Sequence, residues 1–182
     1  MPAPITKLTY QDYLLFPDDG KRYEIIDGDL DMTPAPFTRH QILAMRLSHV
    51  FMNYLEQHPI GHVLAAPCDV VLSDSDIVQP DLLLVIHDGK ARITEKNVQG
   101  PPDLLIEILS PGTAARDRDL KRKRYEHFGV REYWLVDPAD NIIEILSLKD
   151  TGFSQSWKGT TPDTMTSPLV LGLTIDLAKL FM

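Results

Sequence analysis

The apolar and polar residues of this chain follow patterns that predict both helices and strands. Thr38–His58 has an apolar stripe at helical spacing opposite a polar side, which predicts an amphipathic helix. Arg22–Thr33 alternates around Asp27-Gly28, a dipeptide that favours a type I′ turn, and so predicts a β-hairpin. Ile77–Ile86 and Asp103–Leu109 are nearly continuous apolar runs, typical of strands covered on both faces.

Shorter segments complete the expected set. A short helix is expected at Leu8–Leu15, and residues 91–99 suit a polar connection or a short helix. Further strands and a C-terminal helix are expected at residues 61–64, 68–72, 133–136, 142–147, 153–157 and from Asp176 onward. Because we find no internal repeat and no long linker, residues 1–182 are expected to form a single domain.

The segment Gly100–Pro138 has the order strand, turn, helix, strand. Its helix is expected to begin near Thr113 and to end at Gly129. Placing residues 100° apart puts Asp117, Lys121 and Tyr125 on the inner side, together with Arg124 and Phe128 and with Leu120 at the edge.

Lys121 is therefore predicted to point inward, whereas Lys123 points to water. An inward lysine next to a buried strand that carries an acid suggests a chemical site. The simpler alternative is a helical i,i+4 pair between Asp117 and Lys121, which contributes only about 0.2–0.5 kcal/mol.

Composition limits the expected binding partners and cellular location of the protein. A net charge of −8 argues against general affinity for nucleic-acid phosphates. Cys68 is the single cysteine, so an internal disulfide is excluded and a cytoplasmic location is expected. The sequence shows neither a secretory signal nor an apolar run long enough to cross a membrane.

The positive charge is unevenly distributed. Seven cations lie within sixteen residues: Arg116, Arg118, Lys121, Arg122, Lys123, Arg124 and Arg131. A local basic surface that contacts nucleic acid is one interpretation, and a solvated basic helix face is the other. The pattern alone favours the solvated face.

Three acidic residues compete as metal ligands. Glu107 interrupts an apolar strand, where a carboxylate requires a partner or a cation. Asp103 lies on the same strand but about 13 Å away at ~3.3 Å per residue, too far to share one ion, and is better interpreted as a cap. Asp81 begins another strand that could lie beside that of Glu107, so we select Asp81 and Glu107.

Two carboxylates on adjacent strands and an inward lysine suit Mg²⁺-dependent phosphodiester hydrolysis. The carboxylates hold a hard cation that lowers the pKa of water and neutralises charge on the phosphate. Lys121 would orient the attacking water or stabilise the transition state. Asp117 would orient Lys121, and Arg122 or Arg124 would contact the nucleic-acid backbone.

Motifs along nearly the whole chain carry a family resemblance. They are LTYQDYL, RYEIIDGDL, PAPFTRHQ, VQPDLLLV, PPDLLIEILSP, the spacing of Asp117, Lys121 and Tyr125, EYWLVDP and SPLVLGLTIDLAKLF. With these motifs the sequence resembles the Uma-type (DUF820-like) family of restriction endonucleases, within the PD-(D/E)xK nuclease superfamily.

The resemblance implies an α/β (α+β) restriction-endonuclease-like core, with a mixed β-sheet flanked by helices and preceded by the N-terminal hairpin. It also implies Asp81 and Glu107 as ligands of Mg²⁺ (or Mn²⁺). Leu109 stands where the superfamily motif has lysine, and the family supplies this group from the following helix, at Lys121. Glu24 and His40 match recurrent family positions that support the site. From pattern alone, Glu24 suits a solvated strand edge and His40 a packing or capping role.

The leading hypothesis is a metal-dependent DNA endonuclease acting as a homodimer, without a small-molecule cofactor. The alternative is a non-catalytic nuclease-fold module for DNA binding or assembly, which Leu109 and the acidic charge favour. Hydrolysis of another phosphate ester ranks last, because no glycine-rich phosphate loop is visible.

Overall fold

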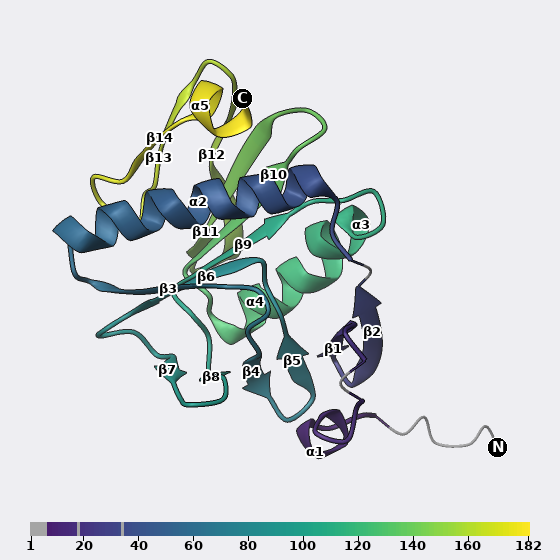
Figure 1. Ribbon diagram of the computed structural model, residues 1–182. Helices are drawn as coiled ribbons and strands as arrows, with labels where there is room; N and C mark the ends of the chain where they lie inside the picture. Colours follow the sequence, from purple (N-terminus) through teal and green to yellow (C-terminus); the bar gives the residue numbers. More distant parts are fainter. Residues whose placement is uncertain (1–6, 18, 34) are drawn as a thin grey trace.

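The computed structural model describes residues 7–17, 19–33 and 35–182. Within these residues it has two six-stranded sheets, a two-stranded pair and several helices (Figure 1). The helical segments are α1 (Tyr10–Tyr13), α2 (Thr38–Gln57), α3 (Ala114–Arg116), the π-helical segment η1 (Asp117–Lys121), α4 (Arg122–Phe128) and α5 (Leu177–Phe181).

We call the first sheet the core sheet, with the order β12-β11-β10-β9-β6-β3. Only β9 and β10 pair in parallel, so the sheet is mixed, as predicted. Its strands are β3 (Gly61–Ala65), β6 (Leu82–Ile86), β9 (Leu104–Ile108), β10 (Glu132–Asp137), β11 (Ile142–Lys149) and β12 (Gly152–Thr160).

The second sheet, which we call the hairpin sheet, has the order β2-β1-β5-β4-β8-β7. Its strands are β1 (Arg22–Ile26), β2 (Asp29–Thr33), β4 (Val70–Ser73), β5 (Asp76–Val78), β7 (Arg92–Ile93) and β8 (Val98–Gln99). The β1–β2 turn has positive φ at both Asp27 and Gly28, as a type I′ turn requires. The remaining pair is β13 (Thr164–Thr166) with β14 (Thr174–Asp176).

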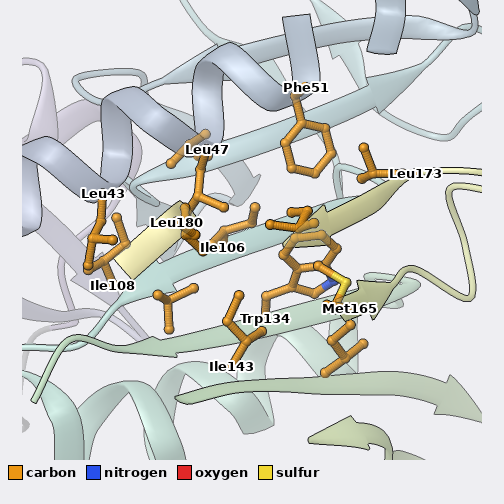
Figure 2. Close-up of a cluster of buried hydrophobic side chains, with 14 of the residues drawn as sticks. Leu43, Leu47, Phe51, Ile106, Ile108, Trp134, Ile143, Met165, Leu173 and Leu180 are labelled. Atoms are coloured by element: carbon orange, nitrogen blue, oxygen red, sulfur yellow. The ribbon is translucent and has the colours of Figure 1, made fainter. Parts of the chain in front are cut away.

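Helices cover both faces of the core sheet. The long α2 runs across one face, and α3, η1 and α4 lie on the other side (Figure 1). Leu43, Leu47 and Phe51 of α2 point onto Ile106 and Trp134 of the sheet, beside residues from the C-terminal segment (Figure 2). Burying such large apolar side chains contributes about 1.5–3 kcal/mol each and fixes α2 in place.

The alternation of β9 decides which of its residues face the site. Leu104, Ile106 and Ile108 belong to the cluster under α2, whereas Leu105 belongs to the cluster on the opposite face. Glu107 has the same parity as Leu105, so it points away from α2 and toward η1 and α4. The acid that interrupts the apolar run thus lies beneath the helix that carries Lys121.

Several sequence expectations need correction. Residues 91–99 form the short strands β7 and β8 rather than a helix. Ile77–Ile86 is two strands in different sheets, broken at Gln79–Asp81, because Pro80 has no backbone donor to continue a ladder. Leu120 is 40% exposed rather than buried at the helix edge.

An ion pair joins the hairpin sheet to α4. Arg124 donates to the fully buried Asp76 through Nε at 2.7 Å and through Nη2 at 2.5 Å. Burial alone would raise the pKa of Asp76, but the hydrogen bonds from Arg124 bring it below the ordinary 3.8. Arg124 therefore holds the two layers together.

We expect Arg124→Met to lower the free energy of unfolding by about 3–5 kcal/mol, because it leaves the Asp76 charge buried without a partner. Lys123→Met removes only the exposed pair with Asp119 and should cost less than about 1 kcal/mol. Urea denaturation at pH 7 checks both. The deficit of Arg124→Met should shrink as the pH falls below 3.8, where Asp76 becomes protonated. Equal losses in the two variants at pH 7 would contradict this account.

Candidate functional site

Strand pairing brings Asp81 and Glu107 together. β6 and β9 are antiparallel neighbours with Leu82 opposite Ile106, so the next step of the register places Asp81 opposite Glu107. Asp81 Oδ2 also accepts a hydrogen bond from the backbone N–H of Ile108 at 2.9 Å. The two strands lie side by side, as expected from the sequence.

Asp81 is held as a carboxylate by two side chains from different elements. His40 Nε2, from the first turn of α2, lies 2.9 Å from Asp81 Oδ2, and Arg22 Nη1, from β1, donates to Oδ1 at 3.2 Å. Burial would raise the pKa of Asp81, but the hydrogen bond with His40 and the charge of Arg22 bring it below its ordinary value. His40 thus packs against the site and contacts one of its acids.

Glu107 is buried and accepts two hydrogen bonds at a single oxygen. Lys121 Nζ donates to Oε1 at 2.9 Å, and the Tyr125 hydroxyl donates to the same atom at 2.8 Å. Burial raises the pKa of Glu107 to about 8; Lys121 opposes the shift, whereas Asp117, Asp81 and Glu24 add to it. Negative charge on Glu107 is therefore unfavourable in this site, and a bound cation would favour its ionised form.

Lys121 points inward and is only 2% exposed. Its ammonium lies 2.9 Å from Glu107 Oε1, 2.9 Å from Glu24 Oε1 and 3.8 Å from Asp117 Oδ1. Burial would lower the pKa of Lys121, but these three carboxylates raise it above its ordinary value. The ammonium consequently remains charged, and the i,i+4 contact with Asp117 coexists with the two shorter pairs.

The sequence pattern predicted the wrong environment for Glu24. It is 1% exposed rather than solvated, because the hairpin sheet docks against the helical layer. Besides pairing with Lys121, its Oε1 accepts the backbone N–H of Gln79 at 2.7 Å. Glu24 therefore links the hairpin to both Lys121 and the chain segment that leads to Asp81.

Asp81, Glu107 and Lys121 line a cavity of about 390 Å³. Its charged and polar lining side chains are Arg22, His40, Asp81, Glu107, Arg116, Asp117, Lys121, Thr33, Ser110 and Thr113. Arg22 and Arg116 were missed by the sequence reasoning, although Arg22 shares a strand face with Glu24 and could have been found from that alternation.

The two arginines predicted to contact nucleic acid do not line this cavity. Arg124 pairs with Asp76, and Arg122 donates to the backbone oxygen of Phe153 at 3.2 Å. Their contact with nucleic acid stays a prediction.

The donor set suits a hard divalent cation. Within residues 7–17, 19–33 and 35–182, no group of three or more His, Cys, Asp or Glu side chains is arranged to hold a metal. Asp81 and Glu107 nevertheless supply oxygen ligands of the kind that Mg²⁺ prefers. Oε2 of Glu107, unlike Oε1, accepts no hydrogen bond from a described residue. The carboxyl groups of Asp117, Asp81 and Glu24 lie near enough to raise the pKa of Glu107.

Comparison with known proteins identifies the family of this chain. The sequence pattern of the Uma2 family, described as "Putative restriction endonuclease", matches residues 10–178. The chain belongs to the Uma2 family. It is also 26% identical over 160 residues to the "Uncharacterized protein slr1290" of Synechocystis sp. (strain PCC 6803), covering 82% of this chain and 79% of that protein.

The fold recurs in a solved structure. The chain resembles a crystal structure described as "a putative nuclease belonging to DUF820" from Anabaena variabilis, with a TM-score of 0.79 at 19% identity. The likeness covers 96% of this chain and 97% of the other. The nuclease-type fold predicted from the sequence, with mixed sheets flanked by helices, is thereby confirmed.

In the part of the chain that the structure describes, each helix is too short or too polar to cross a bilayer.

We expect the buried carboxyl group of Asp117 to lower the stability of the folded protein. It is buried, its Oδ1 has no hydrogen-bond partner, and burial raises its pKa above 3.8 even though Lys121 opposes the shift. A carboxyl group whose pKa is raised by folding destabilises the folded state once it ionises. Asp117→Asn should therefore raise the urea midpoint at pH 7, and this gain should disappear at pH values below 3.8.

Asp119→Asn is the matched control for Asp117→Asn. Asp119 lies in the same helical segment but is exposed, so its replacement should change the free energy of unfolding by less than about 1 kcal/mol. A lower urea midpoint for Asp117→Asn than for the wild type at pH 7 would contradict the assignment.

Proposed function

We propose that this protein is a metal-dependent endonuclease that hydrolyses phosphodiester bonds in DNA. Asp81 and Glu107 bind Mg²⁺ (or Mn²⁺), and Lys121 acts on the attacking water or the phosphate. The observation that carries the proposal is the buried Lys121 ammonium, 2.9 Å from Glu107 and lining the same cavity as Asp81. Membership of the Uma2 family supports the same reaction class.

The position of Lys121 accounts for the departure at Leu109. In the superfamily motif the lysine follows the acid by two residues on one strand, but Leu109 here is buried in the apolar cluster beneath α4. Lys121 approaches Glu107 from η1 instead. A lysine supplied from the adjacent helix can serve the same atom, because catalysis depends on where the ammonium lies rather than on its place in the sequence.

The charges and hydrogen bonds of the site indicate a different role for each residue. A bound divalent cation supplies Lewis-acid polarisation of the phosphate and lowers the pKa of water. Lys121 keeps its proton, so it donates a hydrogen bond and neutralises developing charge rather than accepting a proton. Glu24 holds Lys121 in place, and Tyr125 orients Glu107. Arg22 and Arg116 line the cavity with guanidinium groups that suit a phosphate.

Cleavage of supercoiled plasmid tests the proposal. We expect nicking with Mg²⁺ or Mn²⁺ but not with EDTA, and a loss of at least about 100-fold in Asp81→Asn, Glu107→Gln and Lys121→Met, since each removes charge at the reacting phosphate. Lys123→Met is the matched control, because Lys123 is exposed two residues away, and it should retain activity. Full activity in Lys121→Met would remove the proposed lysine.

Metal binding separates the ligands from the lysine. Titration calorimetry with Mn²⁺ should show binding by the wild type and by Lys121→Met, but not by Asp81→Asn or Glu107→Gln. This pattern is expected because an ammonium cannot ligate a cation. If Asp81→Asn and Glu107→Gln both still bind Mn²⁺, the assignment of Asp81 and Glu107 as its ligands is wrong.

A non-catalytic DNA-binding or assembly module is the competing function. The net charge of −8 and the buried Leu109 favour it. Binding of Mn²⁺ and DNA without cleavage of plasmid or single-stranded DNA would support that module instead. Homodimer assembly and a cytoplasmic location stay predictions from the sequence.

A further inference from the structure

A second cavity adjoins the proposed catalytic one. It measures about 440 Å³, within the range of small-ligand sites, and shares Phe37, His40, Ser110 and Pro111 with the first cavity. The two cavities are therefore neighbours, and a ligand of the second would lie next to a group held in the first.

The walls of the second cavity are mainly apolar. The apolar lining includes Leu109, Pro111 and Ala114, together with Pro138 and Ala139 of the β10–β11 turn. Phe37 stands at the boundary between the two cavities and is 69% exposed. An aromatic ring held open at such a boundary presents a flat surface for another ring.

Polar side chains also line the second cavity. Ser110 and Asp137 carry oxygens that can accept a hydrogen bond from a ring N–H or an exocyclic amine. Part of this capacity is already used, because Asp137 Oδ1 accepts the backbone N–H of Ala139 at 3.0 Å and Oδ2 accepts from Arg118 at 3.4 Å. Arg39 donates to Asn141 Oδ1 at 2.6 Å, so part of its donor capacity is used as well. The chemistry suits a flat, partly polar ring better than a phosphate.

Charge attraction alone cannot supply the affinity for nucleic acid. The seven cations between residues 116 and 131 all have acceptors within the protein: Asp31, Glu144, Glu107, the backbone oxygen of Phe153, Asp119, Asp76 and Asp103, in chain order. With a net charge of −8, little counterion release is available. Base stacking is the other general source of affinity for single strands.

We propose that this second cavity binds an unpaired nucleobase next to the scissile phosphate, with the base stacked on Phe37. A base inside a duplex is already stacked and cannot enter such a cavity, so the substrate is single-stranded nucleic acid or carries an unpaired base. This inference rests on the proposed nuclease function and specifies its substrate class.

Fluorescence anisotropy in EDTA tests the stacking without cleavage. The probes, each mixed with the intact 182-residue chain, are a fluorescein-labelled fifteen-nucleotide oligothymidylate, an abasic strand of the same length and a fifteen-base-pair duplex. The wild type should bind the oligothymidylate more tightly than the other two. Phe37→Ala should weaken that binding by about 5- to 150-fold, the equivalent of one stacked base.

Variants at Phe37 separate stacking from simple apolar contact. Phe37→Trp should retain binding, whereas Phe37→Leu should weaken it, because only the former keeps an aromatic face. Leu171→Ala is the control, since Leu171 is 78% exposed and lines neither cavity. Circular dichroism spectra identical to that of the wild type establish that each variant is folded.

Other outcomes separate this inference from the proposed nuclease. Equal affinity for oligothymidylate and abasic strand, or no binding of either, would overturn the base site, even if plasmid cleavage depends on Lys121. Phe37-dependent binding of oligothymidylate by a protein that cleaves nothing would sustain the base site and overturn the nuclease instead.

Discussion

The site depends on one buried ammonium shared between carboxylates from two sheets. Lys121 lies 2.9 Å from Glu107, on the core sheet, and 2.9 Å from Glu24, on the hairpin sheet. Removing such a charge from water costs several kcal/mol, so its burial is stable only because both acids are present. Each acid in turn is tolerated in an apolar surrounding because Lys121 neutralises part of its charge.

This constraint organises the surrounding fold. The core sheet is fixed between α2 and the α3–η1–α4 layer (Figure 1), and the alternation of β9 directs Glu107 toward η1 and α4. The hairpin sheet then docks so that Glu24 reaches Lys121 and Arg124 reaches Asp76. The site is therefore formed where three layers meet, and none of the layers supplies it alone.

Much of this arrangement could be predicted from the sequence. The apolar strands β6 and β9, the α2 helix, the type I′ hairpin and the inward direction of Lys121 follow from periodicity and turn chemistry, which are local properties. The break at Gln79–Asp81, which separates β5 from β6, was not predicted. The burial of Glu24 and the lining positions of Arg22 and Arg116 depend on how two sheets dock. Alternation predicts which side of a strand a residue occupies, but it does not say what covers that side.

The same limit explains the basic segment. Seven cations in sixteen residues indicate a positive surface when counted along the chain. In three dimensions Arg116, Arg124, Lys121 and Arg118 find acceptors on β2, β5, β9 and β11, and these pairings are invisible to local charge counting. Lys123 is different, because it pairs with Asp119 four residues away. A high density of lysine and arginine in a sequence therefore does not establish a positively charged surface that is free to bind a partner.

Placing the lysine on η1 rather than on β9 also loosens the relation between chemistry and sequence spacing. The segment between Glu107 and Lys121 includes the turn at residues 110–113 and α3, and the contact between the two side chains is made by strand and helix rather than by that turn. Insertions or deletions there would leave the ammonium in place as long as the helix kept its contacts with the sheet. A motif defined by the number of residues between acid and lysine would overlook such proteins, whereas one defined by the packing of helix on strand would retain them.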